Sequence, residues 1–445
     1  MLETLNTLLW GPGTLALILG TGAWLTLRTG GFPQRNLGRA LALSLGREAR
    51  RKGRGGVSPF GSLMTALAST VGTGNIVGVA AALVSGGPGA LVWMELAALL
   101  GLAAKFAECM LAVKYRHVRR DGTRWGGPMA VMETRLGSAG AVLGRFYALF
   151  ALLMAFAMGA MAQSGALADT FSAAFTLPRW RVGLVTAALA LTILLGGIRR
   201  IAEISTVLVP VMALLYLGGG LAVILGNLRR LPEALILMLR CAVAPEAALG
   251  GALGIVTRRE ALRWGVARSV FSNEAGLGSA AITAACADTE DPVKQGLISM
   301  TGVFFDTMVI CTVTGLAICC SGTLGTADGA GRPLTGAALT LRAFETVLGP
   351  LAPWLIGAAL GLFAFTSVLG CAVQAETTAS YLLGPEAVRP CRVLYGLAVF
   401  VGAVIPMATV LQLADLANAL MAFPNLVCLL LLSGEIAGEC GRKER

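Results

Sequence analysis

Residues 66–89 read ALASTVGTGNIVGVAAALVSGGPG, and residues 268–285 read RSVFSNEAGLGSAAITAA. In both stretches, glycine and polar residues interrupt an otherwise apolar run. Glycine is a poor helix former, and polar side chains at membrane depth are costly unless they face a cavity. Two such segments, each opening a set of five apolar runs, predict an inverted repeat whose broken helices meet near the bilayer midplane.

The glycines alone also fit a second interpretation, which is close helix packing through small residues. In both segments, however, polar side chains cluster with the glycines. They are Ser69, Thr70, Thr73 and Asn75 in the first segment and Ser272, Asn273 and Glu274 in the second. This clustering favours a binding cavity.

The composition excludes a soluble protein. Of the 445 residues, 56% are hydrophobic and 13% are charged, whereas a soluble domain carries about 25% charged residues. A helix that crosses the bilayer needs about 20 mostly apolar residues. Eleven such runs are centred near residues 18, 76, 101, 158, 190, 215, 278, 308, 367, 399 and 421. We therefore expect an all-α polytopic membrane protein with about eleven transmembrane helices, because backbone groups in lipid need internal partners.

The distribution of Lys and Arg predicts the orientation. Residues 28–56 hold eight of these cations and residues 114–145 hold seven. With both segments in the cytoplasm, 23 cations lie inside and 11 outside, as the positive-inside rule requires. The N-terminus is then outside and the C-terminus cytoplasmic. The net charge of +11 is accordingly a topology signal, and we expect the lipid bilayer, rather than nucleic acid, as its partner.

The expected organisation has five parts. Residues 1–57 form an extra N-terminal transmembrane helix and a basic cytoplasmic loop, and residues 58–228 form the first five-helix repeat. Residues 229–265 are an extracellular connection, residues 266–432 the second repeat, and residues 433–445 a cytoplasmic tail. The richness in arginine, alanine and glycine, with only five lysines, is typical of a GC-rich bacterial genome. We therefore expect the plasma (inner) membrane of a bacterium.

The sequence does not favour an enzyme. Its single histidine, His117, lies in a basic loop, and its ten cysteines are scattered mostly through apolar runs. An intramembrane enzyme needs a nucleophile–base pair or a metal cluster within the spans, and neither pattern is present. We expect no cofactor and see no sign of an obligatory protein partner.

The two interrupted segments resemble those of the alanine/glycine:cation symporter family, also called sodium:alanine symporters. The resemblance continues in order through the chain, in residues 69–116, 126–129, 196–201, 266–280, 291–297, 302–307 and 415–426. It implies the leucine-transporter fold, with one extra helix before ten core helices. It also implies import of a small neutral amino acid, chiefly alanine or glycine, together with sodium.

A zwitterionic amino acid needs a positive cradle for its carboxylate and acceptors for its ammonium group. Backbone amides at the break formed by Gly72, Thr73, Gly74 and Asn75 can supply the first, since glycine permits close approach. Carbonyls freed between Phe271 and Gly276, including that of Asn273, can supply the second. The Phe271 ring is a candidate apolar wall or a core aromatic. Gln163 lies at a position that the family uses in its pocket, although an interhelical hydrogen bond is the alternative.

Sodium is a hard cation that prefers oxygen ligands. By resemblance to the common sodium site of the fold, the carbonyls of Ala68 and Val71 would face the hydroxyl groups of Thr366 and Ser367. Such hydroxyls often bond only to their own helix. A second sodium site could use Thr70 and Asn75.

Ionisable residues within spans are functional candidates by default. Asp306 lies in the middle of a span and is our candidate for gating or coupling. Lys105 and Glu108 are three residues apart, so we interpret them as a structural ion pair. Asp415 and Asn418 share a face of the last span, where packing and gating are both open.

One residue departs from the family pattern. After Gly370 the family usually has Trp-Ser-Tyr-Tyr-Gly-Glu, whereas this chain has Cys371, Ala372, Val373, Gln374, Ala375 and Glu376. If position 371 lines the pocket, cysteine enlarges it, and the substrate is a neutral amino acid larger than alanine.

Two other transport mechanisms stay open at this point. A proton-coupled amino-acid symporter would need a titratable group at the coupling site. Neither Thr366 nor Ser367 is one, although Asp306 keeps this option open. An uncoupled facilitator or channel would share the spans and need no cation site.

Overall fold

The computed structural model describes residues 9–51, 57–118, 122–243, 246–248, 255–327, 329 and 331–444. The described chain is almost entirely helical, as predicted, with two short antiparallel hairpins. One pairs β1 (His117–Val118) with β2 (Arg124–Trp125), and the other pairs β3 (Glu246–Ala248) with β4 (Ile255–Thr257).

The first half of the chain forms the extra helix and the first repeat. Its elements are α2 (Pro12–Arg28), α3 (Phe32–Arg35), α4 (Leu37–Leu45), η1 (Arg47–Arg50), α5 (Pro59–Thr70), η2 (Thr73–Asn75), α6 (Val77–Gly86), α7 (Gly89–Lys114), α8 (Pro128–Met154), η3 (Ala155–Ala162), α9 (Gln163–Phe175), α10 (Arg179–Leu194) and α11 (Gly197–Gly226). The η3 segment is π-helical and joins α8 to α9.

The second half forms the connection, the second repeat and the tail. Its elements are η4 (Leu228–Arg230), α12 (Leu231–Val243), α13 (Arg258–Asn273), α14 (Ser279–Ala285), α15 (Pro292–Val303), η5 (Phe304–Cys311), α16 (Thr312–Ser321), α17 (Gly336–Leu348), η6 (Gly349–Leu351), α18 (Ala352–Leu383), η7 (Pro385–Ala387), α19 (Val388–Val404), α20 (Met407–Leu431) and α21 (Ser433–Glu444). The η5 segment is also π-helical.

Local sequence signals fix the starts of the helices that flank the two breaks. The Ser58 hydroxyl accepts a hydrogen bond from the Gly61 amide at the start of α5, where proline occupies the first turn. At the start of α13, Thr257 and Glu260 form a capping box. Caps of this kind satisfy amides that have no partner within the helix.

Both interrupted segments are broken helices, as the glycines predict. The axis bends by 63° between the helical segments Pro59–Thr70 and Thr73–Gly86. In the second segment, Glu274, Gly276 and Gly278 all have positive φ angles between α13 and α14. A glycine tolerates this left-handed conformation without steric cost, and the helix therefore ends there.

The predicted number of spans is tested only in part. Within the described residues, seven helices are long and apolar enough to cross a membrane, or eight if the bent pair around Gly72 is one span. The other three expected spans are α2 with 17 residues, α10 with 16 residues, and the broken α13–α14 pair. The count of eleven therefore stays a prediction.

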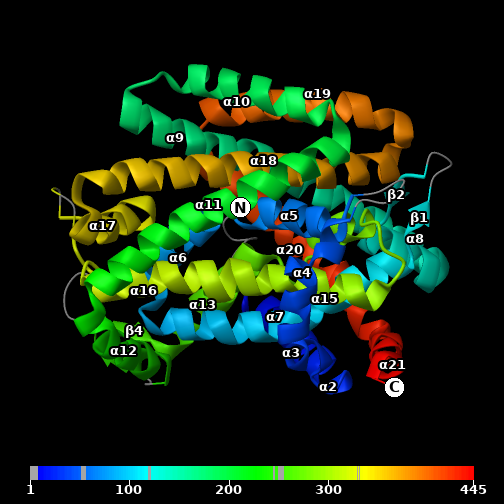
Figure 1. Cartoon of the computed structure of the whole chain (residues 1–445), viewed down its shortest axis with the longest axis horizontal. Coiled ribbons are helices and arrows are strands. Elements are labelled where there is room, and N and C mark those ends of the chain that lie inside the picture. Colours follow the sequence, from blue (N-terminus) through cyan, green and yellow to red (C-terminus); the bar gives the residue numbers. More distant parts are fainter. Residues whose placement is uncertain are drawn as a thin grey trace.

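Figure 1 shows the long helices lying side by side across the view. The helices α12 and α17 lie at one end of this bundle, and the hairpin β1–β2 and the tail helix α21 lie at the other. Lys114 and Arg135, two cations of the basic segment 114–145, are on the side of α21, since both form ion pairs with Glu435 in this helix.

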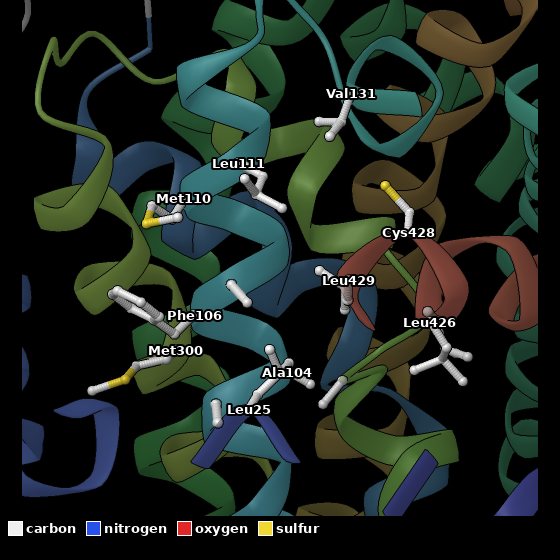
Figure 2. Packing of buried hydrophobic residues seen from close by; sticks show 14 of the residues in the cluster. Leu25, Ala104, Phe106, Met110, Leu111, Val131, Met300, Leu426, Cys428 and Leu429 are labelled. Carbon is white, nitrogen blue, oxygen red and sulfur yellow. The ribbon is translucent and has the colours of Figure 1, made fainter. Parts of the chain in front are cut away.

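The helix α7 lies at the centre of the largest apolar core. Its residues Phe106, Met110 and Leu111 are fully or almost fully buried. They belong to a cluster with Leu25 of α2, Val131 of α8, Met300 of α15, and Leu426 and Leu429 of α20, as Figure 2 shows. This core fixes α7 against both repeats and so places it beside the second helix break.

Candidate functional site

The first helix break redirects hydrogen bonds that a continuous helix would make. The Gly72 amide, which would otherwise reach the Ala68 carbonyl, donates to Asn75 Oδ1 at 3.0 Å. The Asn75 amide donates to the Gly72 carbonyl at 3.3 Å. Of the four amides expected to form a cradle, the described contacts therefore leave those of Thr73 and Gly74 for a ligand.

Open space lies beside Gly74, because a Cβ at this position would meet no heavy atom within 4 Å. The surroundings of Gly72 are much tighter. A Cβ there would lie 2.8 Å from the Ser367 hydroxyl oxygen and 3.5 Å from Gln163 Nε2. The Thr73 hydroxyl donates to Gln163 Oε1 at 3.3 Å. The structure thus brings the first break, Gln163 and Ser367 together.

The helix α18 approaches the end of α5 closely. A Cβ on Gly370 would lie 2.4 Å from the Ser69 amide nitrogen and 2.9 Å from the Ala68 carbonyl carbon. The Ser367 hydroxyl, one turn earlier on α18, is buried and has no hydrogen-bond partner among the described residues. It lies beside Gly72, two residues after the end of α5. This arrangement combines backbone and hydroxyl oxygens of the kind that sodium prefers.

Thr366 faces another direction. Its hydroxyl donates to the carbonyls of Leu362 and Phe363 in its own helix, at 2.9 and 3.0 Å, and contacts Met212 Sδ on α11 at 3.2 Å. In this arrangement its hydroxyl oxygen does not join that of Ser367. Its role as a sodium ligand stays a prediction. Thr70, predicted for a second sodium site, is half-buried at the end of α5.

Asp306 joins the two broken helices. Its Oδ1 accepts a hydrogen bond from Asn75 Nδ2 at 2.8 Å, and its Oδ2 accepts one from the Ser272 hydroxyl at 2.6 Å. The Thr307 hydroxyl donates to the same Oδ2 at 2.9 Å. The Asp306 carboxylate is fully buried within the π-helical segment η5. Any change in its charge therefore acts on both breaks at once.

Asn273 stabilises the second break from within. Its Oδ1 accepts from the Ala275 amide at 2.9 Å, and its Nδ2 donates to the hydroxyl groups of Ser269 and Thr307 at 3.2 and 3.0 Å. Its side chain is fully engaged in the protein. The backbone carbonyl of Asn273 therefore stays a candidate for substrate binding, whereas its side chain already bonds to the protein.

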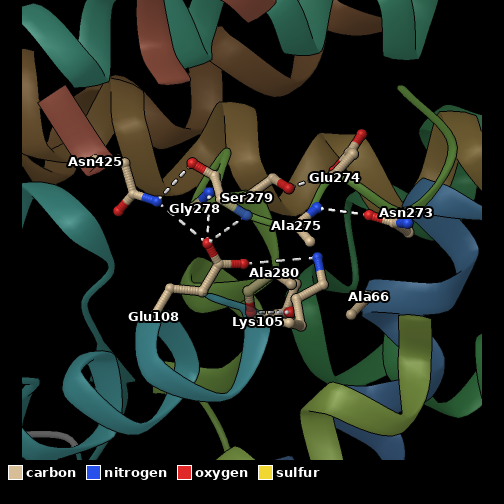
Figure 3. Close-up of polar contacts among 12 residues, drawn as sticks. Ala66, Lys105, Glu108, Asn273, Glu274, Ala275, Gly278, Ser279, Ala280 and Asn425 are labelled. Carbon is tan, nitrogen blue, oxygen red and sulfur yellow. Dashed lines mark hydrogen bonds and ion pairs between the residues drawn. The ribbon is translucent and has the colours of Figure 1, made fainter. Parts of the chain in front are cut away.

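Glu108 and Asn425 hold the second break from outside (Figure 3). Glu108 Oε2 accepts from the amides of Gly276 and Gly278 at 3.2 and 3.1 Å and from Asn425 Nδ2 at 3.1 Å. Asn425 Nδ2 also donates to the Gly276 carbonyl at 2.9 Å. The structure differs here from the expected free carbonyl at Gly276, because both backbone groups of this residue bond to the protein.

The predicted ion pair between Lys105 and Glu108 is confirmed. Lys105 Nζ lies 3.6 Å from Glu108 Oε1, and both side chains are buried. Nearby, the Ser279 hydroxyl donates to the Glu274 carboxylate. One buried cation and the carboxylates of Glu108 and Glu274 thus surround the turn between α13 and α14.

Phe271 lies between an aromatic ring and a cationic side chain. Its ring centroid is 6.5 Å from that of Trp10, and the Arg268 guanidinium carbon is 5.4 Å from it. Trp10 Nε1 in turn donates to the Asp415 carbonyl at 3.0 Å. Trp10 therefore links the Phe271 ring of α13 to α20.

Cys371 lies one helical turn after Ser367 and is buried. A Cβ on Gly159 would lie 2.2 Å from Cys371 Cβ and 2.9 Å from the Tyr395 hydroxyl oxygen. Cys371 therefore packs between η3 and α19. Whether this position sets the size of the substrate stays a prediction.

Sequence reasoning missed Asn425 and the part that Glu108 plays at the second break. The available signal was Asn425 itself, a polar residue that follows Pro424 in an apolar run of the last span. A polar amide at membrane depth is costly without a partner. Its partner, however, lies on α7, more than three hundred residues earlier in the chain.

Comparison with known proteins decides the family. The chain matches the sodium:alanine symporter family over residues 1–441. The chain belongs to this family. It is 40% identical, over 99% of its length and 96% of the relative, to the sodium/alanine symporter AgcS of Methanococcus maripaludis. It is 37% identical to the "Probable sodium/glutamine symporter GlnT" of Bacillus subtilis, over 96% of this chain and 87% of that protein.

The fold of this symporter is similar to that of a solved manganese transporter from Eremococcus coleocola. The two agree with a TM-score of 0.52 at 14% identity, over 83% of this chain and 76% of that one. The likeness supports the fold alone. Membership of the family identifies a multi-pass membrane transporter in which sodium-coupled amino-acid symport is the characteristic activity.

Proposed function

We propose that this symporter imports a small neutral amino acid together with sodium by alternating access. One observation carries the proposal: the first break, Gln163 and Ser367 converge, while Asp306 joins this break to the second one. A substrate and a cation bound there would both contact the broken helices. Their binding would therefore be coupled.

The substrate carboxylate binds at the amides of Thr73 and Gly74. These amides lie at the start of the helical segment that continues as α6, where backbone N–H groups and the helix dipole favour an anion. Gln163 Oε1 lies close enough to Thr73 to accept from the substrate ammonium group. The side chain of the amino acid then extends toward the open space beside Gly74.

Sodium is the second substrate. The Ser367 hydroxyl, together with the carbonyls of Ala68 and Val71, supplies neutral oxygens near the end of α5. A buried hydroxyl without a hydrogen bond is costly, and a bound cation would remove this cost. Sodium binding orders the end of α5 and so completes the cradle for the carboxylate.

The substrate class follows from the site and from the relatives. Alanine and glycine are the first candidates, because AgcS is a sodium/alanine symporter. The name of GlnT extends the candidates to glutamine. Cys371 in place of an aromatic residue favours the larger neutral amino acids.

One observation favours proton coupling as a second candidate. Asp306 is a fully buried carboxylate at the junction of the breaks, and protonation would change its charge there. A proton-coupled symporter would use this carboxylate in place of a sodium site.

The proposed orientation places the N-terminus outside and α21 in the cytoplasm of a bacterial cell. The ends of α7 and α8 that carry Lys114 and Arg135 then face inward, as the positive-inside rule requires. In this orientation α17 lies toward the outer side. The substrate site then lies between the cytoplasmic surface and α17.

The test is uptake of labelled alanine into proteoliposomes under an inward sodium gradient, with potassium as the control. Accumulation that requires sodium supports the proposal. Accumulation driven by a proton gradient in potassium alone would support the second candidate. Uptake that never exceeds equilibrium under any gradient would contradict both. A competition panel of glycine, serine and glutamine then ranks the substrates.

A further inference from the structure

An apolar groove lies on the outside of the helix bundle, between α4, α5, α11 and η5. Its volume is about 280 Å³. Leu63 and Leu67 of α5 and Val71, directly after its end, form one wall, and Leu217 of α11 and Phe305 of η5 also line the groove. Figure 1 shows α4, α5, α11 and α15, which continues into η5, as neighbours on the face toward the viewer.

The rim of the groove is exposed at the surface of the protein. Leu214 and Leu45, which line it, are 71% and 60% exposed. In a membrane protein, apolar surface at this position faces hydrocarbon chains. The groove is therefore accessible to lipid from the bilayer.

A cation lies at one end of the groove. Arg50 lines it, with its guanidinium carbon 4.8 Å from the centroid of the Phe60 ring. No carboxylate of the described residues forms an ion pair with Arg50. Glu48, the single acidic residue in the segment 28–56, forms an ion pair with Lys294 at 2.7 Å. Among the described residues, Arg50 thus presents a positive charge without an ion-pair partner at the end of an apolar groove.

We propose that the groove binds an anionic phospholipid from the leaflet that faces the basic segment. One acyl chain lies along α5 between Phe60 and Val71, and the phosphate binds Arg50. An amphiphile with one anionic group and a long apolar chain matches both features, because basic side chains at a membrane surface attract anionic headgroups. This inference does not depend on which ion drives transport.

The position of the groove gives the lipid an effect on the transport site. The same face of α5 that lines the groove ends at Val71, beside the first break. A bound chain adds apolar contacts between α5 and α11. The lipid therefore favours conformations in which α5 stays packed against α11, whatever substrate the protein carries.

Native mass spectrometry of the purified full-length protein tests the proposal, with phosphatidylglycerol and phosphatidylcholine of identical chains as probes. We expect one phosphatidylglycerol to be retained in preference to phosphatidylcholine. In R50Q, its affinity should fall about fivefold, the amount expected for one basic side chain near a headgroup. R47Q is the matched control, since Arg47 is an exposed arginine of the same η1 turn that does not line the groove.

A second variant tests the position of the acyl chain. Ala213 lines the groove and is half-buried, so A213W fills the space and should weaken retention of both lipids. Equal losses in R50Q and R47Q would overturn the proposal, because the loop would then attract lipid without a site. Unchanged retention in A213W, or a stable dimer without lipid, would also overturn it. If A213W does not fold, the comparison of R50Q with R47Q decides.

Discussion

Ser367 and Thr366 are neighbours in α18, yet their hydroxyl groups have different surroundings. The Ser367 hydroxyl is buried without a hydrogen-bond partner beside the first break, whereas that of Thr366 bonds to carbonyls of its own helix. Adjacent helical residues differ in direction by about 100°. A resemblance in sequence assigns both residues to the cation site, but of the two hydroxyl groups only that of Ser367 lies beside Gly72 without a hydrogen bond to any described residue.

This difference predicts unequal effects of two alanine substitutions. Ser367→Ala removes an oxygen from the proposed sodium site and should raise the sodium concentration for half-maximal uptake about tenfold. Thr366→Ala serves as the matched control and should change it by less than about threefold. Sodium-dependent uptake in proteoliposomes measures both. Equal shifts, or a larger shift in the Thr366 variant, would place the cation elsewhere.

The two glycines of the first break, Gly72 and Gly74, also have different surroundings. A side chain at Gly74 would enter open space, whereas one at Gly72 would meet the Ser367 hydroxyl at 2.8 Å. Gly74→Val should therefore leave the thermal midpoint unchanged and weaken alanine binding at least about tenfold, because it blocks the approach to the amides. Gly72→Ala should weaken alanine binding and also lower the midpoint. Calorimetric titration and thermal unfolding measure these effects. A Gly74→Val variant that binds alanine normally would contradict the cradle.

At the scale of elements, the break between α13 and α14 depends on α7. The Glu108 carboxylate accepts hydrogen bonds from two amides of the break while it faces Lys105 at 3.6 Å. A buried ion pair becomes strongly destabilising when one partner is removed, since the other charge stays buried. Removing either residue alone should therefore destabilise the break.

A double-mutant cycle tests this dependence. Lys105→Met and Glu108→Gln should each lower the free energy of unfolding by about 3 kcal/mol. The double variant should lose much less than the sum, because no unpaired charge remains. The control is the pair Arg342–Glu345, which has the same spacing on α17 but an exposed arginine, and whose removal should cost below about 1 kcal/mol. Equilibrium unfolding in mixed micelles measures all of them, and additive losses in the Lys105–Glu108 cycle would refute the coupling.

The sequence predicts those features of the helices that arise from residues close together in the chain. The two breaks and the mid-span position of Asp306 follow from residues within a few positions of each other. The bond between Asn425 and Glu108 does not, because it joins two residues that are 317 positions apart in the chain. The short helices α2 and α10 show the same limit, since an apolar run does not by itself fix where a helix begins and ends.

At the scale of the whole molecule, the tail helix α21 connects distant parts of the chain. Glu435 forms ion pairs with Lys114 of α7 at 2.6 Å and Arg135 of α8 at 3.1 Å, and accepts a hydrogen bond from Tyr115. Partial burial opposes ionisation of Glu435, but the hydrogen bonds from Lys114 and Tyr115 outweigh it and lower its pKa below 4.5. The docking of α21 therefore depends on pH.

The sign of this dependence follows from the lowered pKa. A carboxyl group with a lowered pKa in the folded state contributes stability above its unfolded value, and this contribution is lost as the pH falls through the folded value. The thermal midpoint of the wild type should therefore fall more steeply below about pH 4.5 than that of Glu435→Gln. Thermal unfolding between pH 3 and pH 7 measures both slopes. Parallel curves would mean that Glu435 does not contribute to the docking of α21.

The central claim is that sodium and the amino acid bind to one coupled site at the two breaks. Titration of purified protein with alanine, in sodium and in potassium at equal ionic strength, tests it most directly. We predict that sodium tightens alanine binding at least about tenfold, and that alanine tightens sodium binding by the same factor, since coupling between sites is reciprocal. Asp306→Asn should reduce this factor, because Asp306 joins the two breaks. Equal alanine affinities in the two salts would contradict the claim.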